Sequence, residues 1–176
     1  MTTIKARLTS FPIAVAALLE CGAHIRRNGW RNNFHLELEA YGTYNSEVIV
    51  RVSDTDGTRN PWAVITEDDT MAQDWEIIMD TGDKPVPDDF TPSMGTYAHA
   101  LNALLNGAQS IRMTSGWHPS MEVRLVDGKV MIEEKVIEMG KVMVLRLPNG
   151  DWKYYRPATQ DISGAWTIIE ATPQAA

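Results

Sequence analysis

The dipeptide Gly-Trp occurs twice in the chain, at residues 29–30 and 116–117, each time shortly after a segment with helical spacing. Residues 10–22 and 96–107 both carry a helix-capping residue at the start, apolar residues at helical intervals and a glycine at the end. A set of elements that recurs in the same order is typical of an internal repeat. The chain is therefore expected to contain two copies of one small unit.

The segments after each helix recur as well. Residues 34–65 alternate like antiparallel strands with an Asp-Gly turn, and a short helical turn leads to a last strand at residues 75–78. The second half repeats this order with a tight hairpin over residues 121–134, a second hairpin over 142–155 and a final strand at 166–169. We predict an α+β fold made of two tandem copies of a unit in which one short helix packs on an antiparallel β meander.

The two halves are expected to be joined by a linker over residues 81–95, because this segment holds three prolines and two glycines without periodicity. The chain would then comprise a first repeat at residues 1–80 and a diverged second repeat at 96–176. The second half has two extra residues between its helix and its Gly-Trp pair and lacks one residue before its last tryptophan. Loss of a binding site in one half is one interpretation of this divergence.

The charge balance limits the partners of the protein. Its 16 basic and 23 acidic residues give a net charge of −7, which disfavours binding to the backbone of a large nucleic acid. A small phosphorylated ligand stays compatible, because a few converging arginines can hold it whatever the overall charge. The single cysteine, Cys21, excludes an internal disulfide, and no membrane-spanning segment is predicted. These features favour a cytoplasmic protein.

Trp30 and Trp117 are the strongest candidates for ligand contacts, because each follows a glycine in a polar loop. An exposed indole beside arginine can stack on a base, although packing of the loop against the sheet explains the same pattern equally well. Arg26, Arg27, Arg31 and Arg112 could direct guanidinium groups at a phosphate, but a solvated charge run paired with acidic residues is slightly favoured on the residues alone. Trp75 and Trp166 are assigned to packing.

Sequence motifs for catalysis are absent. The histidines, His24, His35, His99 and His118, show no metal-ligand spacing, and neither a catalytic triad nor a phosphate-binding glycine loop is present. Three aspartates, Asp68, Asp69 and Asp74, are better explained as residues that cap a helical turn than as a metal cluster. The sequence therefore predicts a protein that is not an enzyme and that needs no metal or cofactor.

The first half carries a set of motif residues that runs from the glycine after the helix to an Asp-Trp-Glu strand. This set comprises Gly22, Arg27, Gly29, Trp30, Pro61, Trp62, Thr66, Asp69, Ala72, Asp74, Trp75 and Glu76. The second half keeps Gly107, Arg112, Gly116, Trp117, Tyr155, Asp161 and Trp166, but it lacks the Asp-Trp-Glu ending. The pattern resembles the second Thoeris anti-defence family of phages and prophages.

The resemblance implies a binding protein that sequesters the cyclic ADP-ribose isomer made by a Thoeris defence system and does not cleave it. It also implies an oligomer with pockets where copies meet, here a homodimer of two-repeat chains in the cytoplasm of the bacterial host. The residues expected to bind ligand are Arg27, Asn28, Trp30, Trp62, Asp74, Arg112, Trp117 and Tyr155. Alternative functions are sequestration of cyclic oligonucleotides, hydrolysis of a small nucleotide, and a phage structural or protein-interaction module.

Overall fold

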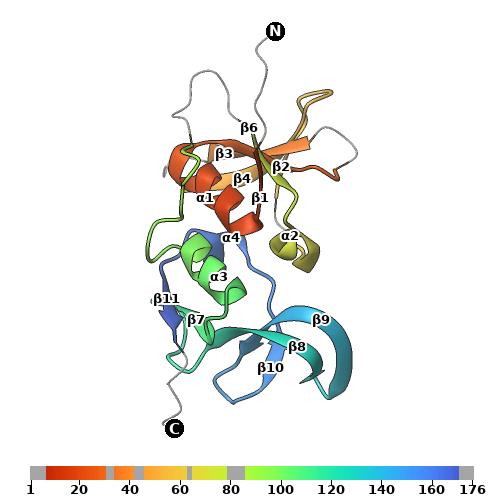
Figure 1. Ribbon diagram of the computed structural model, residues 1–176, viewed down its shortest axis with the longest axis vertical. Helices are drawn as coiled ribbons and strands as arrows, with labels where there is room; N and C mark the ends of the chain where they lie inside the picture. Colours follow the sequence, from red (N-terminus) through yellow and green to blue (C-terminus); the bar gives the residue numbers. More distant parts are fainter. Residues whose placement is uncertain (1–6, 31–33, 42–45, 63–64, 79–85, 171–176) are drawn as a thin grey trace. The chain divides into compact units, whose positions relative to one another are not determined.

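The chain divides into two compact units, Met1–Ser93 and Met94–Ala176. The boundary falls inside the segment that the sequence predicts as a linker. The computed structural model describes residues 7–30, 34–41, 46–62, 65–78 and 86–170. Both units combine short helices with an antiparallel sheet (Figure 1), so the predicted α+β class is confirmed. Among the described residues, no helix has both the length and the apolar character needed to cross a bilayer.

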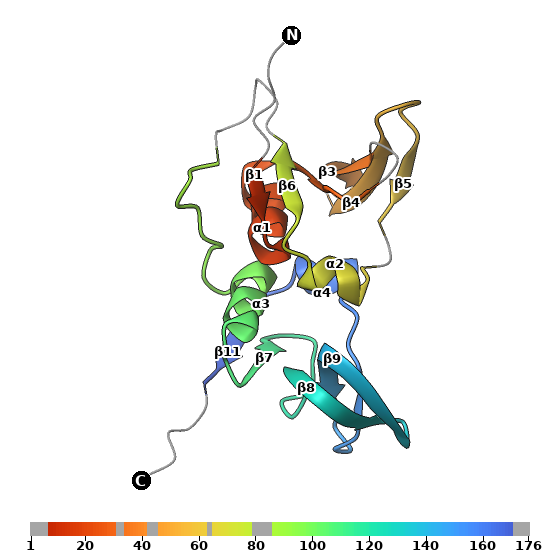
Figure 2. The same ribbon diagram turned by 45° about the vertical axis from the view of Figure 1, so that its right-hand side comes forward.

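The first unit places its helices against a single six-stranded sheet. Its elements are β1 (Arg7–Thr9), α1 (Phe11–Cys21), β2 (His24–Arg27), β3 (Phe34–Tyr41), β4 (Ser46–Ser53), β5 (Arg59–Pro61), α2 (Glu67–Met71) and β6 (Trp75–Ile78). The strands are antiparallel in the order β1-β6-β2-β3-β4-β5. Figure 2 shows α1 alongside β1 and β6.

The second unit has a five-stranded antiparallel sheet in the order β10-β9-β8-β7-β11. Its elements are α3 (Tyr97–Leu105), β7 (Ser110–Met113), β8 (Glu122–Ile132), β9 (Lys135–Arg146), β10 (Trp152–Tyr154), α4 (Thr159–Ile162) and β11 (Trp166–Ile169). Apart from β1, the elements follow one another as in the first unit, and corresponding strands have corresponding neighbours. This agreement supports the predicted repeat, while common descent of the two units stays a proposal.

Local sequence signals account for the ends of the two long helices. Ser10 occupies the N-cap position of α1 without a side-chain hydrogen bond, and Gly22 ends the helix at a φ of 71°. Thr96 begins α3 and accepts a hydrogen bond of 3.2 Å from a backbone N–H of the first turn. Asn106 is the C-cap of α3, one residue before the predicted Gly107. Both predicted helices are therefore confirmed.

The core of the first unit lies between α1 and one face of the sheet. Side chains of α1 such as Ala14 and Leu18 are fully buried, as are Ile25 on β2 and Leu36 on β3. The register pairs Ile25 with Leu36 and with Ile77, so these three side chains share a face. That face packs against the helix, and the residues between them on each strand point to the opposite face.

The tight hairpin predicted over residues 121–134 is wrong. Strand β8 continues through Asp127 and Gly128, where the pairing register with β9 shifts, and the chain turns at Glu133 and Glu134 with φ values of 49° and 64°. An Asp-Gly pair fits a bulge as readily as a turn. Continuation of the strand buries Ile132 in a small cluster of apolar residues from β9. Figure 1 shows β8 and β9 as a long, curved pair.

The phenol of Tyr97, the first residue of α3, is fully buried, and its hydroxyl has no hydrogen-bond partner among the described residues. Burial raises the pKa of this phenol, so the group stays neutral. A second buried phenol in the same unit, Tyr155, differs because its hydroxyl donates to Asp161 Oδ2 at 3.2 Å. The two tyrosines therefore form a matched pair for a stability test.

We expect Tyr97→Phe to raise the free energy of unfolding by about 1 kcal/mol, because it removes a buried hydroxyl that lacks a partner. Tyr155→Phe should lower it by about 1 kcal/mol, because the Asp161 carboxylate loses a donor. Denaturant unfolding of both variants checks the pair. Loss of stability on Tyr97→Phe would mean that this hydroxyl is hydrogen-bonded after all.

Candidate functional site

The indole of Trp75 is the centre of an aromatic cluster in the first unit. Phe11 of α1, Trp30 of the Gly-Trp loop and Trp62 after β5 pack around it, with ring centroids 5.3, 5.5 and 6.1 Å away. Trp75 and Phe11 are fully buried, whereas Trp30 is half-buried. Trp30 meets Trp75 in a T-shaped arrangement at 72°. The loop tryptophan is therefore fixed by the core but keeps part of its ring accessible.

A hydrogen bond joins the cluster to the short helix α2. The Trp75 Nε1–H donates to the backbone carbonyl of Asp69 at 2.9 Å. Asp69 also completes a capping box, because its N–H donates to Thr66 Oγ1 at 3.2 Å and its carboxylate accepts from the Thr66 N–H at 3.1 Å. The predicted capping role of Asp69 is confirmed, and the cap fixes α2 against β6.

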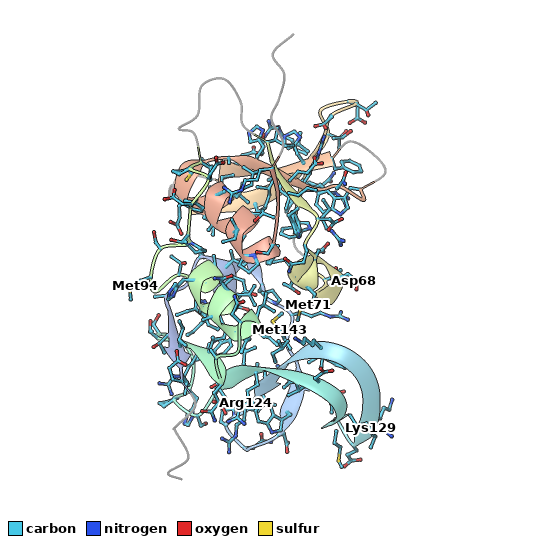
Figure 3. The ribbon with its side chains drawn as sticks, viewed as in Figure 1. Asp68, Met71, Met94, Arg124, Lys129 and Met143 are labelled. Atoms are coloured by element: carbon cyan, nitrogen blue, oxygen red, sulfur yellow. The ribbon has the colours of Figure 1, made fainter. Side chains whose placement is uncertain are left out.

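Arg27 links the end of β2 to the same helical turn. Its Nε donates to Asp74 Oδ1 at 2.9 Å, and its Nη1 donates to the backbone carbonyl of Asp68, which Figure 3 shows on α2, at 3.3 Å. Nη1 also lies 3.5 Å from Asp69 Oδ1. The side chain of Arg27 is 22% exposed. Two of the three guanidinium nitrogens of Arg27 thus pair with carboxylates. This agrees with the interpretation that the arginines form a charge run paired with acidic residues.

Backbone hydrogen bonds shape the Gly-Trp loop. The Asn28 N–H donates to the carbonyl of Asp74 at 2.9 Å, and the Trp30 N–H donates to the carbonyl of Arg27 at 3.1 Å. The side chain of Asn28 is exposed. Four of the predicted ligand-binding residues, Arg27, Asn28, Trp30 and Asp74, therefore come together around one loop. Arg31, which the sequence analysis considered as a possible phosphate contact, lies outside the described residues.

The second unit contains the same aromatic arrangement around Trp166. The rings of Tyr97, Trp117 and Tyr155 lie 5.2, 5.2 and 6.3 Å from it, and Trp117 meets Trp166 at 71°. The Trp166 Nε1–H donates to the carbonyl of Asp161 at 2.7 Å, as Trp75 does to its own helical turn. Both loop tryptophans are thus held in the same way.

Trp62 and Tyr155, which the sequence analysis assigned to ligand binding, are 7% and 6% exposed. Each backbone N–H donates to a carbonyl of the neighbouring strand, Trp62 to Ile49 of β4 at 2.9 Å and Tyr155 to Met143 of β9 at 3.0 Å. The two residues therefore occupy corresponding places beside the central tryptophans, Trp75 and Trp166. The Tyr155 ring contacts Trp117 directly, with centroids 6.0 Å apart, whereas the Trp62 ring contacts Trp75 beneath the first loop.

Arg112 does not occupy the place of Arg27, although the sequence analysis aligned the two. Arg27 is paired in register with Trp75, whereas the residue paired with Trp166 is Met113. Because strand residues alternate between faces, Arg112 points to the other face of its sheet. Its Nη1 donates to a backbone carbonyl in the loop after Trp117, at 2.5 Å. Because the second half has extra residues between its helix and its Gly-Trp pair, aligning the motifs did not reveal that Arg112 is shifted by one position relative to Arg27.

The charge pair of the first unit is replaced by apolar residues in the second. The Thr114 N–H donates to the carbonyl of Ala165 at 2.9 Å, the bond that Asn28 makes with Asp74 in the first unit. Ala165 thus stands where Asp74 stands, next to a methionine in place of the arginine. The second Gly-Trp loop keeps its aromatic support without this ion pair.

A cleft of about 640 Å³ lies in the second unit, beside the end of the β8–β9 hairpin. Its lining includes Met131, Glu134, Leu147 and Trp152, and none of the predicted site residues contributes to it. This cleft could not be predicted from the sequence, because the hairpin was expected to turn several residues earlier.

A comparison with protein families gives a match within the first unit. Residues 9–78 match the model of the Tad2-like family, described as the Thoeris anti-defense 2-like domain. The first unit is thus similar to this family over these residues, which are called the Tad2-like domain below. No curated protein and no solved structure matches the chain. The match includes the whole Trp75 cluster, the capping box and the Arg27–Asp74 pair, so the Tad2-like domain contains the Gly-Trp loop with its charged neighbours.

In the second unit a methionine and an alanine stand at the places of Arg27 and Asp74, and the same two substitutions can test this ion pair in the Tad2-like domain. We expect Asp74→Ala to lower the free energy of unfolding by about 1–2 kcal/mol, because the half-buried guanidinium of Arg27 loses its closest partner. Combined with Arg27→Met, the same change should cost about 1 kcal/mol less. Denaturant unfolding of the single and double variants measures this coupling. Additive effects would show that the two side chains do not stabilise each other.

Proposed function

We propose that the protein binds a small cyclic nucleotide signal of bacterial Thoeris defence, a cyclic ADP-ribose isomer, and holds it without cleaving it. Such sequestration would block the host's anti-phage response. The proposal is supported by the match of residues 9–78 to an anti-defence family. The structural observation that carries it is the Gly-Trp loop, where a half-buried indole lies beside a charged cluster on a rigid aromatic base.

Trp30 is the proposed stacking platform. Its contact with Trp75 fixes the ring before ligand arrives, so little side-chain entropy is lost on binding. Stacking on an aromatic side chain contributes roughly 1–3 kcal/mol per base. A ligand with an adenine ring fits this platform.

Arg27 and Asp74 are the proposed polar contacts. Hydrogen bonds from Nε and Nη1 hold the guanidinium of Arg27 in one orientation. The third nitrogen, Nη2, can then donate a charge-assisted hydrogen bond to a phosphate. Asp74 uses Oδ1 for Arg27, so its other oxygen can accept from a ribose hydroxyl. Asn28, exposed next to them, offers an amide for the base or sugar.

The carboxylates around Arg27 outnumber its single positive charge, because both Asp69 and Asp74 lie within 3.5 Å of it. A pyrophosphate at this loop therefore needs a further cation. We propose that a second chain supplies it in a homodimer whose pockets form where copies meet. The setting would be the cytoplasm of the infected or lysogenic bacterium, where the signal is made.

The first test of the proposal is calorimetric titration of the protein with cyclic ADP-ribose isomers and cyclic oligonucleotides. Trp30→Ala should weaken binding of the best ligand about ten- to a hundredfold, because one stacking contact is lost. Trp117→Ala should weaken it less, because the second loop lacks the charge pair. Thermal melting serves as the control for folding. Equal, negligible losses in both variants would place the binding site elsewhere, and no binding of any nucleotide would favour an interaction module.

The second test concerns the fate of the ligand. We expect nucleotide recovered from heat-denatured protein to be chemically unchanged, because a binding protein of this kind stabilises the ground state and not a transition state. Chromatography of the recovered ligand over a series of incubation times checks this. A product that accumulates with time would show that the protein is a small-nucleotide hydrolase.

A further inference from the structure

Three side chains that could bind a metal ion meet on the first sheet, on the face opposite α1. His35 and Glu37 are two residues apart on β3, so they point to the same face. The pairing of Ile25 with Leu36 places His24 of β2 directly opposite Glu37. Ile25 and Leu36 themselves point to the helix, so these polar side chains project from the other face.

The distances within this group suit a small cation. Glu37 Oε2 lies 3.4 Å from His24 Nε2 and 3.4 Å from His35 Nε2, and one ligand atom from each residue can be chosen so that all lie within 4.8 Å of one another. Ligand atoms around a tetrahedral zinc ion, with bonds of about 2.0–2.1 Å, lie roughly 3.3 Å apart. The two carboxylate–imidazole distances already match this spacing.

Neighbouring charges orient two of the three ligands. His35 Nδ1 lies 2.5 Å from Asp54 Oδ1, and because a carboxylate can only accept, Nδ1 carries the proton. His35 Nε2 is then the coordinating nitrogen, in the carboxylate–histidine arrangement common at metal sites. Arg59 pairs with Glu37 Oε1 and leaves Oε2 directed at the histidines.

The group is charged and sheltered in a way that favours a dication. Arg59 pairs with Glu37 and with Glu39, the latter at 3.1 Å, and Asp54 pairs with His35, so three carboxylates and one guanidinium surround the two imidazoles. The side chains of His24, His35 and Glu37 are 28%, 15% and 13% exposed. They are thus partly desolvated while an ion can still enter. The two imidazoles stack at 4.8 Å, which keeps both rings beside the carboxylate.

We propose that His24, His35 and Glu37 bind a divalent transition-metal ion, with zinc as the ion that best suits two imidazoles and one carboxylate. Three protein ligands leave a fourth position for water or an anionic ligand. Asp54 is a positioning residue that acts through His35. The site is independent of the proposed nucleotide site, because Arg27 and its loop belong to the helix-facing side of the sheet.

The experiment uses the full-length, untagged chain after treatment with a chelator. Calorimetric titration with Zn²⁺ should show saturable binding of one ion per chain, and Co²⁺ should give the intense visible absorption bands of a low-coordinate site. Absence of saturable Zn²⁺ binding to the folded chain would overturn the proposal.

Variants distinguish Zn²⁺ binding at the His24 group from Zn²⁺ binding elsewhere on the acidic surface. His24→Ala and Glu37→Gln should each weaken Zn²⁺ binding at least tenfold, and Asp54→Asn should weaken it about 10–100-fold through the lost orientation of His35. His118→Ala, at an exposed histidine of the second unit, is the matched control and should bind Zn²⁺ as the unaltered protein does. Equal affinity in His24→Ala and His118→Ala would overturn the proposal.

Two further measurements distinguish loss of Zn²⁺ binding from loss of folding. Circular dichroism verifies that each variant is folded, and Zn²⁺ should raise the Tm of the unaltered protein but not that of His24→Ala. Trp30→Ala should keep full Zn²⁺ affinity, because its loop lies on the other side of the sheet. Loss of Zn²⁺ binding in that variant, with the fold intact, would show that the metal is not held by the His24 group alone and would overturn the assignment.

Discussion

The hydrogen bond from the Trp75 indole to the carbonyl of Asp69 is the interaction on which the loop region of the first unit depends. A fully buried tryptophan must satisfy its N–H, and here the indole donates to the short helix α2. This bond fixes α2 against the last strand, and the capping box keeps the Asp69 carbonyl in place. The same bond recurs from Trp166 to Asp161. Each Gly-Trp loop thus packs on a buried indole, Trp75 or Trp166, whose orientation is fixed by this hydrogen bond.

The two units keep this aromatic framework while the polar groups above it differ. In the first unit the framework carries the Arg27–Asp74 pair, and in the second a methionine and Ala165 stand in those places. Replacing both members of a partly buried pair by apolar residues leaves no uncompensated charge, so the fold tolerates the change. A unit of this kind can lose its polar contacts without losing its structure, which explains how the halves could differ in binding.

Local signals in the sequence were sufficient for the helices, the capping box and the strand that starts at Trp75, because each depends on neighbouring residues alone. The position of the β8–β9 turn was missed because Asp127-Gly128 suits a bulge as well as a turn, and only burial of Ile132 decides between them. The place of Arg112 was misjudged because register is set by pairing across strands. The group around His24 was invisible for the same reason, since its members come from two strands and meet only through that pairing.

Strand β2 connects the two proposed sites through its alternation. Ile25 and Arg27 face the helix side, where the aromatic cluster lies, while His24 and Arg26 face the other side. A slip of one residue would exchange these sets and would destroy the core and both groups together. The pairing of Ile25 with Ile77 in the core and the bond of 2.6 Å between Arg26 and Glu76 on the opposite face both hold β2 to β6. The register of one four-residue strand therefore sets the geometry on both faces of the Tad2-like domain.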